Sequence, residues 1–143
     1  MTTTQMLTPA ELDYLSTQRL GRLATVGANG APQNNPVGFH VNAELGTIDI
    51  YGLHMGATRK FRNVKTNPNV ALVVDDVASF DPWVVRGVEI RGVGEALDDG
   101  APPGGRMSPQ IIRIYPERVI SWGVDPALPG MRGRSVAGTP EVA

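Results

Sequence analysis

The sequence predicts a mainly β protein, a small antiparallel barrel with accessory helices. Its 143 residues include 17 glycines and 12 prolines, which divide the chain into short segments that suit strands and turns better than long helices. Six or seven short segments have the composition of strands, and together with two helices they imply a small antiparallel barrel. A chain of this length usually forms one domain, so we expect a single core.

The first expected element is a helix at about 9–18. Thr8 and Glu11 form a capping box around a proline at the first helical position, and Leu12 and Leu15 supply one apolar side. These signals are local, and they fix where the helix begins.

Three strands are expected next. Leu20–Val26 is followed by the turn Gly-Ala-Asn-Gly at 27–30 and a second strand at about 33–41, which together predict a hairpin. A third strand covers 47–52, where Ile48 and Ile50 alternate with polar neighbours as in a half-buried strand.

A second helix is expected after the loop at 53–57. Thr58 can cap it, and Asn67 with Pro68 stops it after about residue 66. The apolar run 70–74 predicts a buried strand, 79–83 a loop, and 84–96 a long strand whose glycines at 87, 92 and 94 suggest bulges. The acid pairs at 75–76 and 98–99 are interpreted as solvated loops.

The end of the chain is expected to hold a loop at 98–109 and two last strands, at 111–115 and 118–124. We therefore expect a cofactor-binding domain at 1–125 and an extended C-terminal tail at 126–143. The tail is rich in Pro, Gly and Arg, and it can be ordered only by lying along another element.

Composition excludes several functional classes. The formal net charge of -1 gives no reason to expect nucleic acid, and no apolar run is long enough to cross a membrane. The Thr-rich N-terminus lacks the layout of a signal peptide, so a cytoplasmic location is expected. With no cysteine and only two separated histidines, a metal site is not expected.

The strongest site signal is the start of the second helix. Thr58 adds a hydroxyl to the free N–H groups of a helix N-terminus, and Arg59, Lys60, Arg62 and Lys65 add positive charge. Basic residues on an exposed helix often have no ligand. Here, however, those in the first turn oppose the helix dipole, so an anion that offsets them is favoured.

No side chains form a recognisable catalytic set. Nucleophile elbows, Walker loops and dinucleotide fingerprints are absent, so reactivity would have to come from a cofactor. Trp83 and Trp122 could flank a planar ring, although large aromatics are more often core residues. His54 could donate to a ligand or be a surface histidine without a role, and His40 is expected to be structural.

Several motifs resemble the pyridoxamine-phosphate-oxidase-like family of FMN-binding split β-barrel proteins. The resemblance covers roughly residues 8–125 and is specific only in combination. The matching segments are 19–26, 30–33 and 36–39 in the opening hairpin, and 58–64 with 67–71 in the phosphate-binding segment. Segments 75–77, 81–83 and 86–92 are similar to the actinobacterial branch that uses the deazaflavin coenzyme F420. Segments 112–114 and 116–123 resemble a narrower group that includes reductases of tetracycline-type biosynthetic intermediates.

The resemblance implies a homodimer with the cofactor in a groove between two barrels. Carried over by position, Thr58, Arg59 and Lys60 would hold the cofactor phosphate. Backbone of two strands would contact the ring, from Pro36, Val37 and Gly38 and from Ile50, Tyr51 and Gly52. Trp83 and Trp122 are candidates for the pocket wall, donated across the dimer.

The implied reaction is hydride transfer from the reduced deazaflavin to a conjugated carbon–carbon double bond of an organic, polycyclic or quinone-like substrate. The proton could come from solvent or from Tyr51. Two alternatives remain open: an FMN-dependent oxidase or flavin reductase, and a non-catalytic barrel that carries or senses the cofactor.

Overall fold

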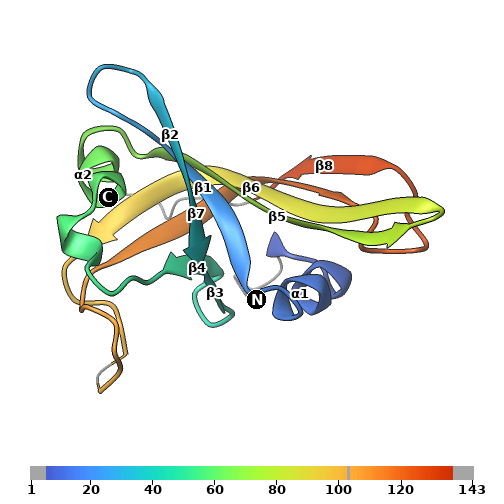
Figure 1. The fold of residues 1–143 in the computed structure, drawn as a ribbon, viewed down its shortest axis with the longest axis horizontal. Helices are drawn as coiled ribbons and strands as arrows, with labels where there is room; N and C mark the ends of the chain where they lie inside the picture. Colours follow the sequence, from blue (N-terminus) through green and yellow to red (C-terminus); the bar gives the residue numbers. More distant parts are fainter. Residues whose placement is uncertain (1–5, 103, 137–143) are drawn as a thin grey trace.

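One eight-stranded antiparallel sheet forms most of the molecule, and it curls around a core, with one helix at one end and the other nearer the middle (Figure 1). The computed structural model describes residues 6–102 and 104–136. The strand order is β2-β1-β5-β6-β7-β4-β3, with β8 paired to β7 outside this path. The expected barrel with accessory helices is thus confirmed as a split, half-closed barrel.

The helices and strands have the following bounds: α1 Pro9–Ser16, β1 Leu20–Val26, β2 Pro32–Gly38, β3 His40–Asn42, β4 Thr47–Ile50, the 3-10 turn η2 Met55–Ala57, α2 Arg59–Thr66, β5 Asn69–Phe80, β6 Trp83–Leu97, β7 Ile111–Trp122 and β8 Met131–Ser135. No helix among the described residues is long and apolar enough to cross a membrane.

The capping box that predicted α1 is present. The Thr8 hydroxyl accepts from the Glu11 N–H at 3.1 Å, and Glu11 Oε1 accepts from the Thr8 N–H at 2.9 Å. The helix ends two residues before the expected position, because Thr17 closes it through its N–H and hydroxyl. Its inner side places Tyr14 and Leu15 in the core.

The expected strand at 33–41 is in fact two strands on opposite edges of the sheet. β2 pairs with β1 as far as Gly38, whereas β3 pairs with β4, with His40 opposite Asp49. The prediction was wrong because no local signal marks the residue at which the chain changes its pairing partner.

Strand β4 is fully buried rather than half-buried. Asp49 is 1 % exposed because Arg113 of β7 covers it and donates to both its carboxylate oxygens at 3.0 Å. The alternation that suggested one wet face therefore reflects a buried ion pair, which is tolerated because it is fully hydrogen-bonded.

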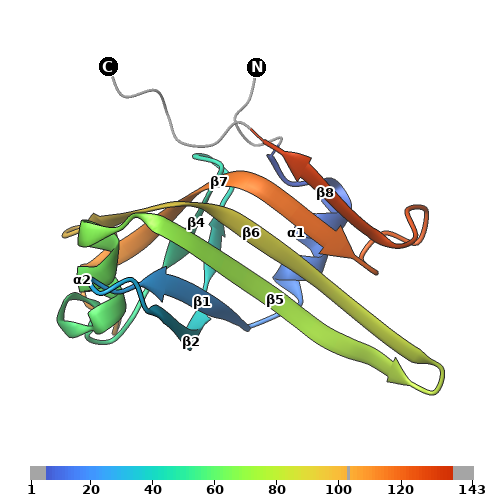
Figure 2. The same ribbon diagram turned by 90° about the horizontal axis from the view of Figure 1, so that it is seen from above.

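The β5–β6 hairpin is much longer than expected, and it projects from the body of the molecule (Figure 2). The predicted loop at 79–83 narrows to a turn at Asp81 and Pro82. Asp75 and Asp76 also lie on β5 rather than in a loop, because Arg22 and Arg86 on the neighbouring strands pair with them at 2.6 Å and 2.7 Å. Cross-strand ion pairs thus keep an acidic segment within the sheet.

The two strands expected at 111–115 and 118–124 are a single strand, β7. Pairing with β6 shifts register between Arg91 and Gly92, opposite Pro116, and then continues. A Cβ on Gly92 would lie 2.0 Å from the Tyr115 carbonyl oxygen, so only glycine permits this approach. The bulge expected from the glycines of β6 is confirmed here, and it absorbs a proline without ending the strand.

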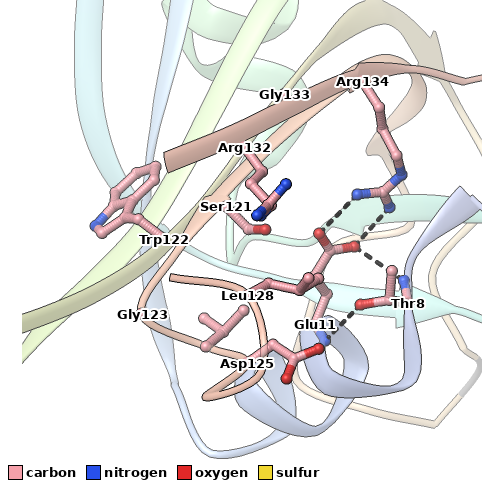
Figure 3. Close-up of a pocket in the computed structure, with 11 residues that line it drawn as sticks. Thr8, Glu11, Ser121, Trp122, Gly123, Asp125, Leu128, Arg132, Gly133 and Arg134 are labelled. Carbon is pink, nitrogen blue, oxygen red and sulfur yellow. Dashed lines mark hydrogen bonds and ion pairs between the residues drawn. The ribbon is translucent and has the colours of Figure 1, made fainter. Parts of the chain in front are cut away.

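Part of the C-terminal segment forms β8, which pairs with β7 from Arg118 to Trp122. Arg134 of β8 is bound by both oxygens of Glu11, at 2.6 Å and 2.8 Å, and also donates to the Met6 carbonyl. The segment therefore lies along the sheet and is connected to α1 by the ion pair between Arg134 and Glu11 (Figure 3). Residues 137–143 of the expected tail lie outside the described residues.

Candidate functional site

Helix α2 begins where the sequence predicted, with Thr58 as its N-cap. The Thr58 hydroxyl accepts from the Phe61 N–H at 3.3 Å and donates to the Met55 carbonyl at 2.7 Å. One side chain thus joins the helix start to the preceding η2 turn.

The cations of α2 have few internal partners. Arg62 donates to the Ala57 carbonyl at 3.2 Å, and Lys65 lies 4.8 Å from the centre of the Phe61 ring. The exposed Arg59 and the half-buried Lys60 form no hydrogen bond or ion pair with any described residue. No acidic residue lies in the helix to balance them, so the N-terminal turn is complementary to an anion.

The buried face of α2 fixes its position against the sheet. Phe61 and Val64 pack into the core, and between them the buried Asn63 donates to Thr25 of β1 at 3.0 Å and Gln33 of β2 at 2.9 Å. Asn63 was not predicted from the sequence to hold α2. A polar residue among the apolar positions of an amphipathic helix was the signal that could have found it.

Ser108 fixes the loop that leads into α2. Its hydroxyl donates to the Gly52 carbonyl and accepts from the Met55 N–H, both at 3.0 Å, and its own N–H donates to Gly52 at 2.9 Å. Met55 is buried below this contact. No sequence signal identified Ser108, because its partners lie more than fifty residues away.

Tyr51 directly follows β4, and its side chain contacts β3. Its ring stacks on His40 with a centroid separation of 6.0 Å and an interplanar angle of 20°. Burial and then the nearby Asp49 carboxylate raise the pKa of the Tyr51 phenol above its ordinary value. The stack also brings the end of β4 beside the residues that follow Gly38.

The two strand segments expected to contact a ring differ in what they expose. Val37 and Ile50 are buried, whereas Pro36 and Gly38 are exposed on β2, and Tyr51 and Gly52 are half-buried. Since β2 ends the strand order, its outer edge has no partner among the described strands. Val37 can therefore meet a ligand only through its backbone at the open edge of β2, whereas Ile50 is 0 % exposed and paired with Ile112 of β7. His54 is exposed in the loop, and His40 is exposed on β3.

The tryptophans lie far from α2 within one chain. Val64 of α2 approaches Gly94 of β6, while Trp83 begins that strand, roughly 35 Å away at about 3.3 Å per residue. Trp122 pairs with Gly87, roughly 23 Å from Gly94 by the same spacing. Figures 1 and 2 both show α2 and the β5–β6 tip at opposite ends. One protomer therefore does not unite the tryptophans with Thr58, Arg59 and Lys60.

Trp83 and Trp122 also differ in their surroundings. Trp83 is 65 % exposed and lies 6.0 Å from the ring of Phe80, itself 79 % exposed. The Trp122 indole instead packs directly against Gly87, where a Cβ would come within 2.3 Å of it. The Trp83 ring is therefore accessible to another molecule, whereas the Trp122 ring is packed against the sheet.

Comparison with known proteins gives a consistent picture. Residues 7–136 match the family model described as pyridoxamine 5'-phosphate oxidase. A 5a,11a-dehydrotetracycline/5a,11a-dehydrooxytetracycline reductase from Streptomyces rimosus is 50 % identical over 123 residues, covering 82 % of this chain and 84 % of the relative.

Solved structures share the fold at lower identity. A conserved hypothetical protein from Mycobacterium tuberculosis aligns with a TM-score of 0.67 and 23 % identity, covering 94 % of each chain. A heme binding protein from Mycobacterium smegmatis aligns with a TM-score of 0.64 and 16 % identity, covering 84 % of this chain and 54 % of that one. At these identities the likeness concerns the fold alone.

Proposed function

Because the chain belongs to the pyridoxamine 5'-phosphate oxidase family, we propose that it is an oxidoreductase that reduces a tetracycline-like, polycyclic substrate. The similarity to the Streptomyces rimosus reductase supports the reaction and the substrate class. The observation that carries the proposal is a pair of cations at the start of α2, Arg59 and Lys60, that have no partner among the described residues. Such a site suits the phosphate of a redox cofactor.

We assign the cofactor as coenzyme F420, with FMN as the alternative. Thr58, Arg59 and Lys60 would hold the phosphate, since two cations and free helix N–H groups meet there without an internal acid. Backbone of Pro36, Val37 and Gly38 at the open edge of β2, and of Ile50, Tyr51 and Gly52, would face the ring. When bound, the reduced deazaflavin supplies a hydride.

The protein's own part in the reaction is orientation. Ser108 holds the Gly52 to Met55 loop and Asn63 holds α2 on β1 and β2, so the elements around the site are fixed before a ligand arrives. The proton for the reduced carbon comes from Tyr51 or from solvent. Tyr51 carries a proton at neutral pH, but its raised pKa makes it a weaker acid than an exposed phenol.

A homodimer would complete the site. Trp83 and Trp122 can reach an α2 N-terminus only if it belongs to a second copy, since both lie far along β6 from their own. The β5–β6 tip also exposes apolar side chains that a partner would cover, namely Val77, Phe80, Trp83, Val84 and Val85. Exposed apolar surface of this extent is typical of an interface.

The test combines binding with turnover. Purified protein is titrated separately with F420 and FMN, and then reduced F420 is mixed with dehydrotetracycline while its reoxidation is followed. We expect tight F420 binding and substrate-dependent reoxidation. Tight binding of FMN alone would select the oxidase or flavin reductase, and F420 binding without turnover would select the carrier or sensor.

A further inference from the structure

Ser108 belongs to the loop between β6 and β7, which lies at the same end of the sheet as α2 (Figure 1). The residue is half-buried, and its hydrogen bonds go to the segment that leads into α2. At one end of a short turn, the Gly52 carbonyl accepts from both the hydroxyl and the N–H of Ser108, at 3.0 Å and 2.9 Å. At the other end, the Met55 N–H donates to the Ser108 hydroxyl at 3.0 Å. One residue thus spans the turn.

Met55 continues this contact to the start of α2. Its carbonyl accepts from the Thr58 N–H at 3.0 Å and from the Thr58 hydroxyl at 2.7 Å. The same hydroxyl accepts from the Phe61 N–H at 3.3 Å, which closes the first turn of the helix. A chain of hydrogen bonds through Met55 and Thr58 therefore connects Ser108 to the first turn of α2.

The loop between β6 and β7 makes a second contact with this segment through Gln110. A Cβ on Gly56 would lie 2.8 Å from the Gln110 side-chain Cδ, so that side chain packs directly on the η2 turn. Gln110 supplies packing, whereas Ser108 supplies directed hydrogen bonds. Because hydrogen bonds require a defined distance and angle, Ser108 is the residue that sets the spacing between Gly52 and Met55.

This spacing matters because the turn joins the two parts of the proposed cofactor site. Gly52 ends the segment proposed to face the ring, and Thr58 begins the segment proposed to hold the phosphate. Between them Leu53 and His54 are exposed, so their packing does not fix the path of the chain. A ligand that carries both a ring and a phosphate must contact both segments at once, and it binds best when their separation is set beforehand.

We propose that Ser108 is a positioning residue that fixes the separation between the ring contacts and the phosphate contacts of the cofactor. The inference rests on the proposed function. Ser108→Ala separates the two ends of the turn, because the backbone N–H at position 108 still donates to Gly52, whereas the Met55 N–H loses the hydroxyl that accepts from it. The ring segment is then held as before, and the phosphate segment is released.

The test compares two ligands that differ only in the phosphate, a deazariboflavin and its 5'-phosphate ester. Affinities are measured by fluorescence titration for wild type, Ser108→Ala and the control Ser16→Ala, which removes an exposed hydroxyl that donates to a carbonyl of α1. Ser108→Ala should bind the ester about two- to tenfold more weakly, as expected for one neutral hydrogen bond, and should bind the phosphate-free ligand as the wild type does. Ser16→Ala should bind both ligands as the wild type does.

Amide hydrogen exchange, followed by nuclear magnetic resonance without any ligand, examines the chain of hydrogen bonds itself. Loss of the Ser108 hydroxyl should speed exchange at Met55 and, through the Met55 carbonyl, at Thr58. The amide of Ile90, within the core strand β6, should exchange as in the wild type.

Equal weakening for both ligands would mean that Ser108 only stabilises the fold, and it would overturn the proposal. Unchanged affinity for the ester in Ser108→Ala, or unchanged exchange at Thr58, would also overturn it. In each of these cases the wild type still prefers the ester, so the proposed phosphate site stands. A wild type that binds the two ligands equally would instead refute that site, and with it the role of Ser108.

Discussion

The ion pair between Glu11 and Arg134 should contribute measurably to stability, and Glu11→Gln tests this. Glu11 is 1 % exposed, and the Arg134 side chain is 35 % exposed. Breaking a fully buried pair costs about 3–5 kcal/mol, but a partly exposed arginine regains water, so we expect a loss of about 2 kcal/mol in the free energy of unfolding. Glutamine still fits the capping box, so α1 itself should begin normally.

The loss should depend on pH. Burial raises the pKa of the Glu11 carboxyl, but hydrogen bonds from Arg134, Thr8 and Ser121 outweigh it, and the net pKa is lowered from its usual 4.5. A carboxyl with a lowered pKa stabilises the fold above its unfolded-state pKa, and that stability is lost as pH falls through the folded value. The difference between wild type and Glu11→Gln should therefore be complete at pH 7 and shrink below about pH 4.5.

The assay is urea unfolding at fixed protein concentration, at neutral and at acidic pH. Glu44→Gln is the matched control, since Glu44 is exposed and its loss should change little. Equal unfolding free energies of wild type and Glu11→Gln at pH 7 would refute the reasoning, as would a difference that stays constant into acid.

Three other changes have defined outcomes. Asn63→Ala removes donors to Thr25 and Gln33 and should lower the free energy of unfolding by about 1–3 kcal/mol in urea, while Asn34→Ala on the exposed face of β2 should not. Gly87→Val should displace the indole that lies against it, seen as a shift of Trp122 emission in a Trp83→Phe background; an unshifted spectrum would contradict the packing. If the chain forms the proposed dimer, Trp83→Asp should weaken it in sedimentation velocity, whereas Leu53→Asp, also exposed but in the loop before η2, should not. A dimer that persists in Trp83→Asp would exclude the β5–β6 tip from the interface.

The sequence predicted the elements whose signals are local. The capping box at Thr8 and Glu11, the N-cap at Thr58 and the turn at 27–30 that ends β1 each lie within a few residues, so α1, α2 and β1 were placed closely. The start of α2 was singled out for the same reason, because its hydroxyl and its cations are adjacent in the chain.

The features that escaped prediction depend on contacts between distant residues. The change of partner between β2 and β3, the burial of Asp49 under Arg113 and the pairing of β8 with β7 are decided by the closed sheet. Ser108 could not be found for the same reason, since its partners Gly52 and Met55 belong to another part of the chain. Cross-strand pairing is specified by the fold rather than by neighbouring residues.

The central claim, that the start of α2 holds the cofactor phosphate, is tested most directly by F420 affinity in Arg59→Ala and Lys60→Ala. Each variant should bind F420 more weakly by about 1.5–3 kcal/mol, roughly a 10- to 150-fold increase in Kd, because a charged hydrogen bond is lost. Arg19→Ala, which removes an exposed cation just before the start of β1, should bind as the wild type does. Unchanged affinity in both α2 variants would contradict the account.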